Sequence, residues 1–141
     1  MIRIDRLEQL AAHLEAGCPG GHEVFDFGQF NEGFIDRFDC GTSGCAAGEL
    51  PVIFPEDWRF DGNGVYQTED PCCTDCDLKL WFGVSGDQTS YLFYPTSEEA
   101  LHNYPPQFGC EKLLYDATRS QVAANIRAFI EWAKANEGVT A

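Results

Sequence analysis

The sequence has few basic residues and no long apolar run. Its 141 residues include nine Lys and Arg against 23 Asp and Glu, which gives a formal net charge of −14. Binding to nucleic acid through phosphates needs a stripe of basic side chains, so we expect no direct nucleic-acid contact. No window approaches the roughly 18 consecutive apolar residues of a membrane span, and charges stand at residues 1–6 where a signal peptide would be apolar. We therefore expect a cytoplasmic protein without a membrane partner.

The composition is typical of a globular chain. Apolar residues make up 44% and charged residues 23%, unlike the composition of disordered or fibrous proteins. The sequence contains no internal repeat, no low-complexity tract and no linker long enough to divide it. Because a chain of this length can bury one sizeable core, we expect residues 1–141 to form a single domain.

Helical periodicity predicts one longer helix near each end of the chain. Apolar residues at helical spacing predict helices over about residues 4–16 and 119–136, and Thr118 and Gln121 open the second with capping-box spacing. Aromatic residues within the periodic segments are expected to pack in the core rather than to hold a ligand. They are Trp58, Trp81, Phe82, Tyr91, Phe93 and Trp132.

Shorter elements are predicted between these two helices. Asp-Gly and Asn-Gly steps predict a β-hairpin with strands at about 57–60 and 65–68. Segment 24–30 is expected to be irregular or a short strand. A short helix is predicted at 42–48, where Thr42 and Ser43 offer hydroxyl caps, and Pro51 and Pro55 end it. Segment 75–82 is apolar enough for a short buried helix, although a strand of the same length fits the pattern as well. Two more short helices are predicted between Ser85 and Pro95, where Ser85 and Gln88 have capping-box spacing, and between Thr96 and Pro105. Together these elements predict a mainly helical α+β domain with two longer terminal helices, short central helices and a small β-hairpin.

The acidic residues are concentrated in the middle of the chain. Between residues 38 and 111, thirteen acids accompany two bases. A field of one sign steers a basic protein partner or a cation toward it, although acidic surfaces also serve solubility alone. We therefore expect a non-enzymatic module that binds a basic protein, for example as a nucleic-acid mimic or an inhibitor. The candidate binding surface consists of Glu56, Asp57, Asp61, Glu69, Asp70, Asp75 and Asp77.

The seven cysteines are the basis of the second hypothesis, a module stabilised by zinc. Their odd number argues against a complete set of disulfides. The spacing Cys73-x-x-Cys76 lets two thiolates hold one Zn²⁺, and Cys72, Cys40 or Cys45 are candidates to complete a tetrahedron. A redox or disulfide pair and thiols that only pack as small apolar side chains are the other interpretations.

Cys40 is also a candidate nucleophile for a cysteine-dependent hydrolase. A thiol near a helix N-terminus has a lowered pKa, and His102 or His22 would serve as its base. The acidic surroundings raise the pKa of a thiol, and the prolines after His102 do not fit a buried strand. The hydrolase is therefore the last alternative, and we expect no enzyme. His13 lies beside the apolar stripe of the first helix and is expected to be structural rather than a ligand.

Three motifs resemble a family of small bacterial and bacteriophage proteins. The motifs occupy 25–27, 40–48 and 54–58, where the family has a Phe-Asp-Met-like stretch, Cys-Gly-Thr-x-x-Cys-Ala-x-Gly and Phe-Pro-Glu-x-Trp. The likeness covers about residues 24–135, with Phe27 where Met is usual and a Cys-rich insertion at 72–76. Because the family has no assigned activity, the resemblance implies one fold and a bacterial or phage context, and no catalytic role.

Overall fold

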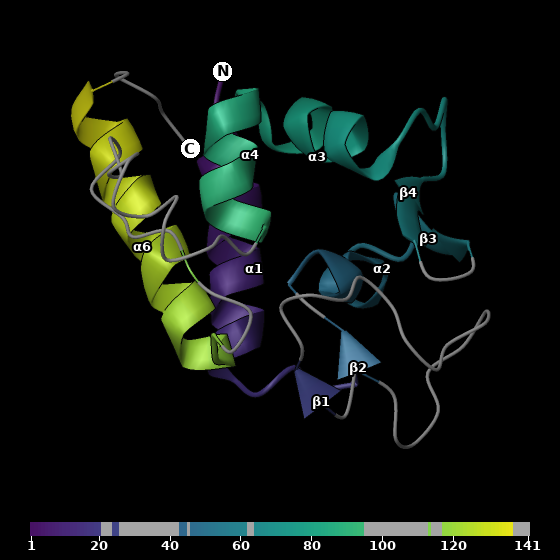
Figure 1. The fold of residues 1–141 in the computed structure, drawn as a ribbon, viewed down its shortest axis with the longest axis horizontal. Helices are drawn as coiled ribbons and strands as arrows, with labels where there is room; N and C mark the ends of the chain where they lie inside the picture. The colour runs from purple at the N-terminus through teal and green to yellow at the C-terminus, as the bar shows by residue number, and fades with distance from the viewer. Residues whose placement is uncertain are drawn as a thin grey trace.

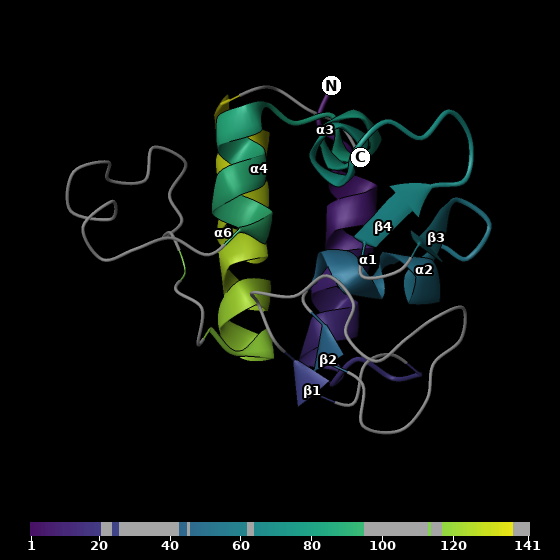
Figure 2. The same ribbon diagram turned by 45° about the vertical axis from the view of Figure 1, so that its right-hand side comes forward.

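The computed structural model describes residues 1–20, 24–25, 43–44, 46–61, 64–94, 113 and 117–136. In chain order, the elements are α1 (Ile4–Glu15), β1 (Val24–Phe25), β2 (Ser43–Gly44), η1 (Ala47–Glu49), α2 (Leu50–Ile53), β3 (Trp58–Asp61), β4 (Gly64–Gln67), α3 (Thr74–Phe82), α4 (Gly86–Phe93) and α6 (Arg119–Asn136). Figures 1 and 2 show α1 between α6 on one side and α2 with the β3–β4 hairpin on the other. The predicted mainly helical α+β fold with a small hairpin is confirmed.

Helix α1 is the centre of the core and packs along α6. Its apolar residues recur at helical spacing, so they form one buried face. The buried residues of α1 are Ile4, Leu7, Leu10, Ala11 and Leu14, and those of α6 include Val122, Ile126, Phe129 and Ile130. The two longer helices predicted at 4–16 and 119–136 are confirmed. The aromatics predicted to be in the core are buried as well, except Trp132, which is partly buried.

Two helices begin with the capping boxes that the sequence predicts. At α4, the Gln88 backbone N–H donates to Ser85 Oγ at 3.2 Å, and the Ser85 N–H donates to Gln88 Oε1 at 2.8 Å. At α6, Thr118 and Gln121 make the same reciprocal pair at 3.2 and 2.8 Å. These bonds satisfy N–H groups that have no partner inside the helix, and so fix where each helix begins.

The predicted hairpin is confirmed, and the segment before it differs from the prediction. Strands β3 and β4 are antiparallel, with Trp58 opposite Gln67. Residues 43–44 form β2, which pairs in parallel with β1, instead of capping a short helix. The helical turn begins later, at η1, and Pro51 lies in the first turn of α2 rather than ending a helix. Proline suits that position because its fixed φ is helical and its missing N–H would have no helical partner.

Helix α3 connects the hairpin to α4 and confirms the helix predicted at 75–82. It ends at Gly83, whose φ of +68° lies in the left-handed region that favours glycine. The helix predicted between Thr96 and Pro105 and most of segment 24–30 lie outside the described residues. None of the described helices combines the length and the apolar character that crossing a bilayer needs.

Candidate functional site

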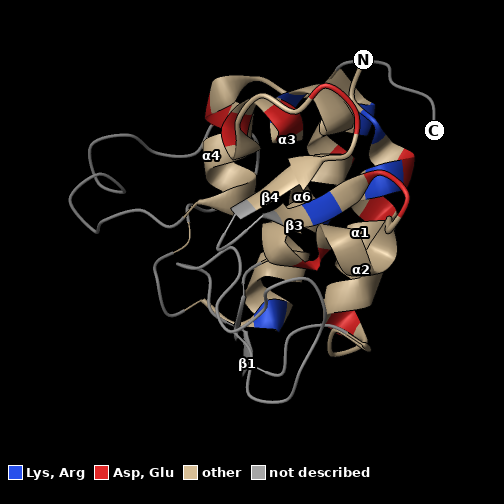
Figure 3. Ribbon diagram, turned by 90° about the vertical axis from the view of Figure 1, so that its right-hand side faces the viewer, with Lys and Arg blue, Asp and Glu red and all other residues tan. Residues whose placement is uncertain are grey.

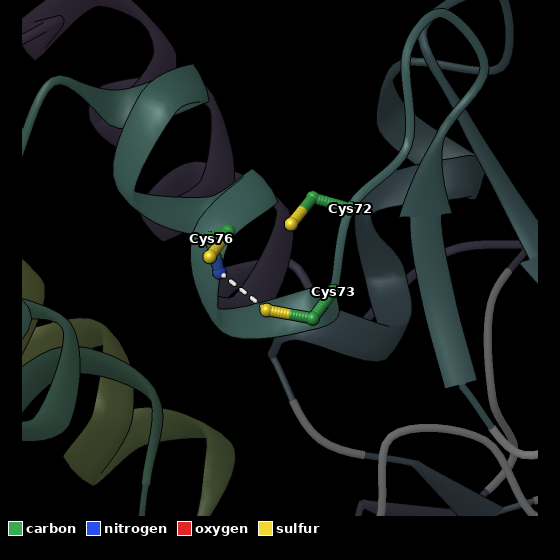
Figure 4. Close-up of side chains that lie close together, drawn as sticks. All are labelled: Cys72, Cys73 and Cys76. Carbon is green, nitrogen blue, oxygen red and sulfur yellow. Dashed lines mark hydrogen bonds between the residues drawn. The ribbon is translucent and has the colours of Figure 1, made fainter.

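Three cysteines gather where α3 begins. Cys72 precedes the helix, Cys73 is its N-cap and Cys76 lies in its first turn. Their sulfur atoms all lie within 4.8 Å of one another, and none of the three cysteines forms a disulfide. Figure 4 shows the three sulfurs converging from the loop and from the first turn of the helix. Cys72 and Cys73 are exposed and Cys76 is partly exposed, so the cluster is open to solvent.

The carboxylate of Asp77 and the hydroxyl of Thr74 hold this segment against the hairpin. Asp77 is fully buried and accepts hydrogen bonds from the backbone N–H of Gln67 at 3.0 Å and of Cys72 at 3.2 Å. Thr74 Oγ1 donates to the carbonyl of Val65 at 2.9 Å. The loop that carries Cys72 is therefore fixed both to strand β4 and to the helix that carries the other two thiols.

The three thiols are electrostatically unequal. The backbone N–H of Cys76 donates to Cys73 Sγ at 3.2 Å and, with the Cys76 and Cys72 thiols, lowers the pKa of Cys73. Hydrogen bonds to Cys73 and then to Cys72 raise the pKa of Cys76 to about 11, because they favour its protonated form. The negative charge of Asp75 raises the pKa of Cys73, but this effect is the smallest of those that act on it. The first negative charge of the cluster therefore resides on Cys73.

The arrangement is suited to a thiophilic metal ion. Tetrahedral Zn²⁺ with Zn–S bonds of about 2.3 Å places its sulfur ligands about 3.8 Å apart. The observed sulfurs are within about 1 Å of that separation, a gap that small rotations of exposed side chains can close. The predicted grouping of Cys72, Cys73 and Cys76 is therefore confirmed. Cys40 and Cys45, predicted as further ligands, lie outside the described residues.

Three of the predicted acidic residues surround one hollow beside the hairpin. The hollow has a volume of about 190 Å³, and Glu56, Asp57, Glu69, Gln67, Thr68 and Trp81 line it. Glu56 and Asp57 are adjacent, lie in the turn before β3, and both line this hollow together with Glu69.

Trp81 forms the apolar part of this hollow. The Arg6 guanidinium lies 3.4 Å from the centre of its ring, and the rings of Phe54 and Trp58 meet it edge to face. Trp81 is 8% exposed, and its indole N–H has no hydrogen-bond partner among the described residues. The indole nitrogen is itself buried, so this missing hydrogen bond is a cost to the fold and lies beneath the surface of the hollow.

The remaining predicted acids are not part of this hollow. The prediction that Asp77 belongs to the binding surface is wrong, because its carboxylate is buried and accepts hydrogen bonds from two backbone N–H groups. Asp70 is exposed in the loop before α3, and Asp75 pairs with Lys79 at 3.5 Å. Asp61 ends strand β3, but its side chain lies outside the described part. Figure 3 shows acidic positions along the loop from β4 to α3 and on α3 itself, with further acidic positions on α4 and around α1 and α2.

A second group of polar side chains is buried between α1 and η1. His13 Nε2 lies 2.8 Å from Glu49 Oε1, and Cys18 Sγ is within 4.8 Å of both side chains. Burial and then the Glu49 carboxylate raise the pKa of Cys18 to about 12, so this thiol stays protonated at neutral pH. The sequence predicts a structural His13, but nothing in the spacing of the chain marks its partner Glu49.

The proposed nucleophile Cys40 and its candidate bases His22 and His102 lie outside the described residues, so the hydrolase alternative stays a prediction. No family model, curated protein or solved structure matches the chain, and the resemblance of residues 24–135 to small bacterial and phage proteins therefore stays a prediction as well.

Proposed function

We propose that the protein is a metal-binding module that holds one Zn²⁺ through Cys72, Cys73 and Cys76. The observation that carries this proposal is the convergence of three solvent-accessible sulfurs within 4.8 Å. Thiolates are soft ligands that select Zn²⁺ and other thiophilic ions over Mg²⁺ or Ca²⁺. The fourth position is left for water or for a further cysteine such as Cys40 or Cys45.

The surroundings of the cluster favour a cation. Glu69 and Asp70 precede the three cysteines and Asp75 lies between two of them, so the local field attracts positive charge. Bound metal replaces the thiol protons, which removes the mutual hydrogen bonds that hold the pKa of Cys76 high. The Asp77 carboxylate keeps Cys72 close to the helix, so metal binding costs little additional conformational entropy of the chain.

Metal analysis tests this function directly. We expect the full-length protein, incubated with Zn²⁺ and desalted, to retain about one Zn²⁺ per chain. Cys73→Ser and Cys76→Ser should each weaken binding at least about tenfold, since each removes one of three thiolate ligands. Titration with Co²⁺, followed by the absorption band of thiolate-to-metal charge transfer, measures the metal affinity of each variant.

Cys18→Ala is the matched control, because Cys18 is buried away from the cluster and should leave the affinity unchanged. Retention of less than about 0.2 Zn²⁺ per chain would contradict the proposal. So would a variant without Cys72, Cys73 and Cys76 that binds as the original protein does.

A second candidate function is the binding of a basic segment of a partner protein in the hollow beside the hairpin. Two observations favour it. Three acidic residues, Glu56, Asp57 and Glu69, line one hollow, and the aromatic residue Trp81 lines it beside them. A Lys or Arg side chain of a partner suits this lining, because the acids attract its charge and its aliphatic part can pack on the aromatic residue. The volume of about 190 Å³ accommodates one long side chain and is below the roughly 300–1,000 Å³ of most small-molecule sites.

A short lysine peptide is the probe for this second function. Its affinity for the full-length protein should fall steeply between low and moderate salt, because exposed charges are screened. The triple variant Glu56→Gln, Asp57→Asn, Glu69→Gln should weaken binding at least about tenfold, measured by fluorescence anisotropy of a labelled peptide.

The control for net charge neutralises three acids elsewhere, with Glu8→Gln, Asp87→Asn and Glu131→Gln. These residues are not part of the hollow, so this variant should change the affinity much less. Equal weakening by the two triple variants would mean that the peptide senses only the overall charge, and the hollow would have no special role.

A further inference from the structure

We propose that the metal-free cysteine cluster is a redox-active dithiol, in which Cys73 attacks a disulfide of a substrate and Cys76 resolves the resulting mixed disulfide. The inference does not rest on the proposed metal site, because it concerns the thiols when no metal is bound. It assigns an activity to the same three residues and names the class of substrate, an accessible disulfide.

The position of Cys73 is that of an attacking thiolate. It is the N-cap of the nine-residue helix α3, is exposed, and has extended backbone with φ −144° and ψ 163°. Its sulfur accepts the backbone N–H of Cys76 at 3.2 Å, as Figure 4 shows. The positive end of the helix and this N–H both stabilise a negative sulfur, while exposure lets a substrate reach it.

Cys76 has the complementary character of a resolving thiol. It lies in the first turn of α3, is less exposed than Cys73, and its sulfur lies within 4.8 Å of the Cys73 sulfur. It is therefore placed to reach a mixed disulfide formed on Cys73, while the more exposed N-cap sulfur is the one that a substrate meets first.

The exchange balances as a two-electron reaction. The Cys73 thiolate attacks one sulfur of the substrate disulfide, forms a mixed disulfide and releases the other sulfur as a thiolate, which takes up a proton. The Cys76 sulfur lies within 4.8 Å of the Cys73 sulfur that now carries the mixed disulfide. The Cys76 thiol loses its proton and attacks Cys73, the Cys73–Cys76 bond forms, and the second substrate sulfur leaves as a thiol after protonation. The substrate disulfide is reduced and the protein dithiol is oxidised.

Chain geometry selects Cys76 rather than Cys72 as the resolving residue. Cys72 and Cys73 are adjacent, and adjacent Cα atoms lie about 3.8 Å apart across a trans peptide. Most disulfides span Cα separations of about 4.4–6.8 Å, so a bond between neighbouring residues is strained. A two-residue gap within the first turn of a helix avoids this strain, and all three sulfurs lie within 4.8 Å.

Oxidised glutathione is the probe for this activity. The reduced full-length protein, kept in chelator, is mixed with oxidised glutathione and analysed by disulfide mapping. We expect the original protein to form the Cys73–Cys76 disulfide, and Cys76→Ser to accumulate one glutathione adduct on Cys73. Cys73→Ser should react at least about tenfold more slowly at the cluster, because the thiol at the N-cap of α3 has been removed. Cys18→Ala should react like the original protein, since the pKa of this buried thiol is about 12.

The pH dependence of alkylation gives an independent readout. The rate of iodoacetamide labelling of Cys73 should rise with pH around a midpoint below the roughly 8.5 of free cysteine, and Cys76 should label last of the three clustered cysteines. An adduct on Cys72 in the Cys76→Ser protein, an unchanged rate in Cys73→Ser, or a first reaction at Cys76 would overturn the inference. Metal content and disulfide mapping are separate measurements, so failure of Zn²⁺ binding and failure of exchange are distinguished.

Discussion

Replacing Phe129 with alanine is expected to lower the free energy of unfolding by about 3–5 kcal/mol, the usual cost of removing a buried aromatic side chain. Phe129 is fully buried on the face of α6 that packs along α1, and its ring centre lies 5.7 Å from that of Trp132. The loss combines the transfer of the ring to water with the cavity that the neighbouring helices cannot fill. Denaturant unfolding followed by circular dichroism provides the measurement, and the midpoint should shift without a large change in slope.

Arg127→Ala is the control for this variant, two residues earlier on α6. Its guanidinium pairs with Glu15 of α1 at 2.9 Å, but the two side chains are 42% and 47% exposed, so solvent screens the pair. Exposed ion pairs contribute little, so the unfolding midpoint should hardly move. A Phe129→Ala protein as stable as the Arg127→Ala protein would mean that contact between α1 and α6 does not dominate the core.

Asp77→Ala is expected to lower the free energy of unfolding by about 2–3 kcal/mol and to weaken metal binding by the cysteine cluster. The carboxylate satisfies the backbone N–H groups of Gln67 and Cys72, and the substitution leaves both without their acceptor. Cys72 is then released from the helix, so metal affinity should fall although all three thiols remain. Unfolding measurements and Co²⁺ titration of the same preparation separate the two effects.

Asp75→Asn provides the comparison within the same helical turn. Asp75 is partly exposed and its interaction is an ion pair with Lys79 at 3.5 Å, so its neutralisation should leave stability almost unchanged. Asp77→Asn keeps one acceptor oxygen and should fall between the two variants in stability. Equal stability of Asp75→Asn and Asp77→Ala would contradict the anchoring role of the buried carboxylate.

The elements that the sequence predicts correctly are those with local signals. Apolar spacing, capping boxes and Asp-Gly or Asn-Gly turns act within a few residues, and the two longer helices, α4 and the hairpin follow from them, whereas the short apolar segment of α3 also fitted a strand. The parallel pairing of β1 with β2 joins residues that are far apart in sequence, with Val24 opposite Ser43, and no local pattern indicates it. Ser43 was therefore predicted as a helix cap.

In the candidate site too, residues that are close in sequence could be predicted, and those that tertiary packing brings together could not. Cys72, Cys73 and Cys76 are close in sequence, so their spacing within one helical turn was enough to predict their grouping. The burial of Asp77 and Glu49 was not predictable, because each carboxylate is buried only where tertiary packing supplies a donor. For Asp77 the donors are backbone N–H groups, and for Glu49 the observed partner is His13 of α1. In sequence, both residues look like members of the acidic surface.

The contact between α1 and α6 also has a consequence for how the chain is made. Glu15 and Arg127, which pair across it, are 112 positions apart. A ribosome that adds about 5–20 residues per second needs about 6–22 s to synthesise this interval. During that time α1 can contact α2 and α3, which are made earlier, but the part of its apolar face that α6 covers stays open to chaperones or to other nascent chains. Yield in a heterologous host should therefore respond to chaperone supply and to slower growth at low temperature.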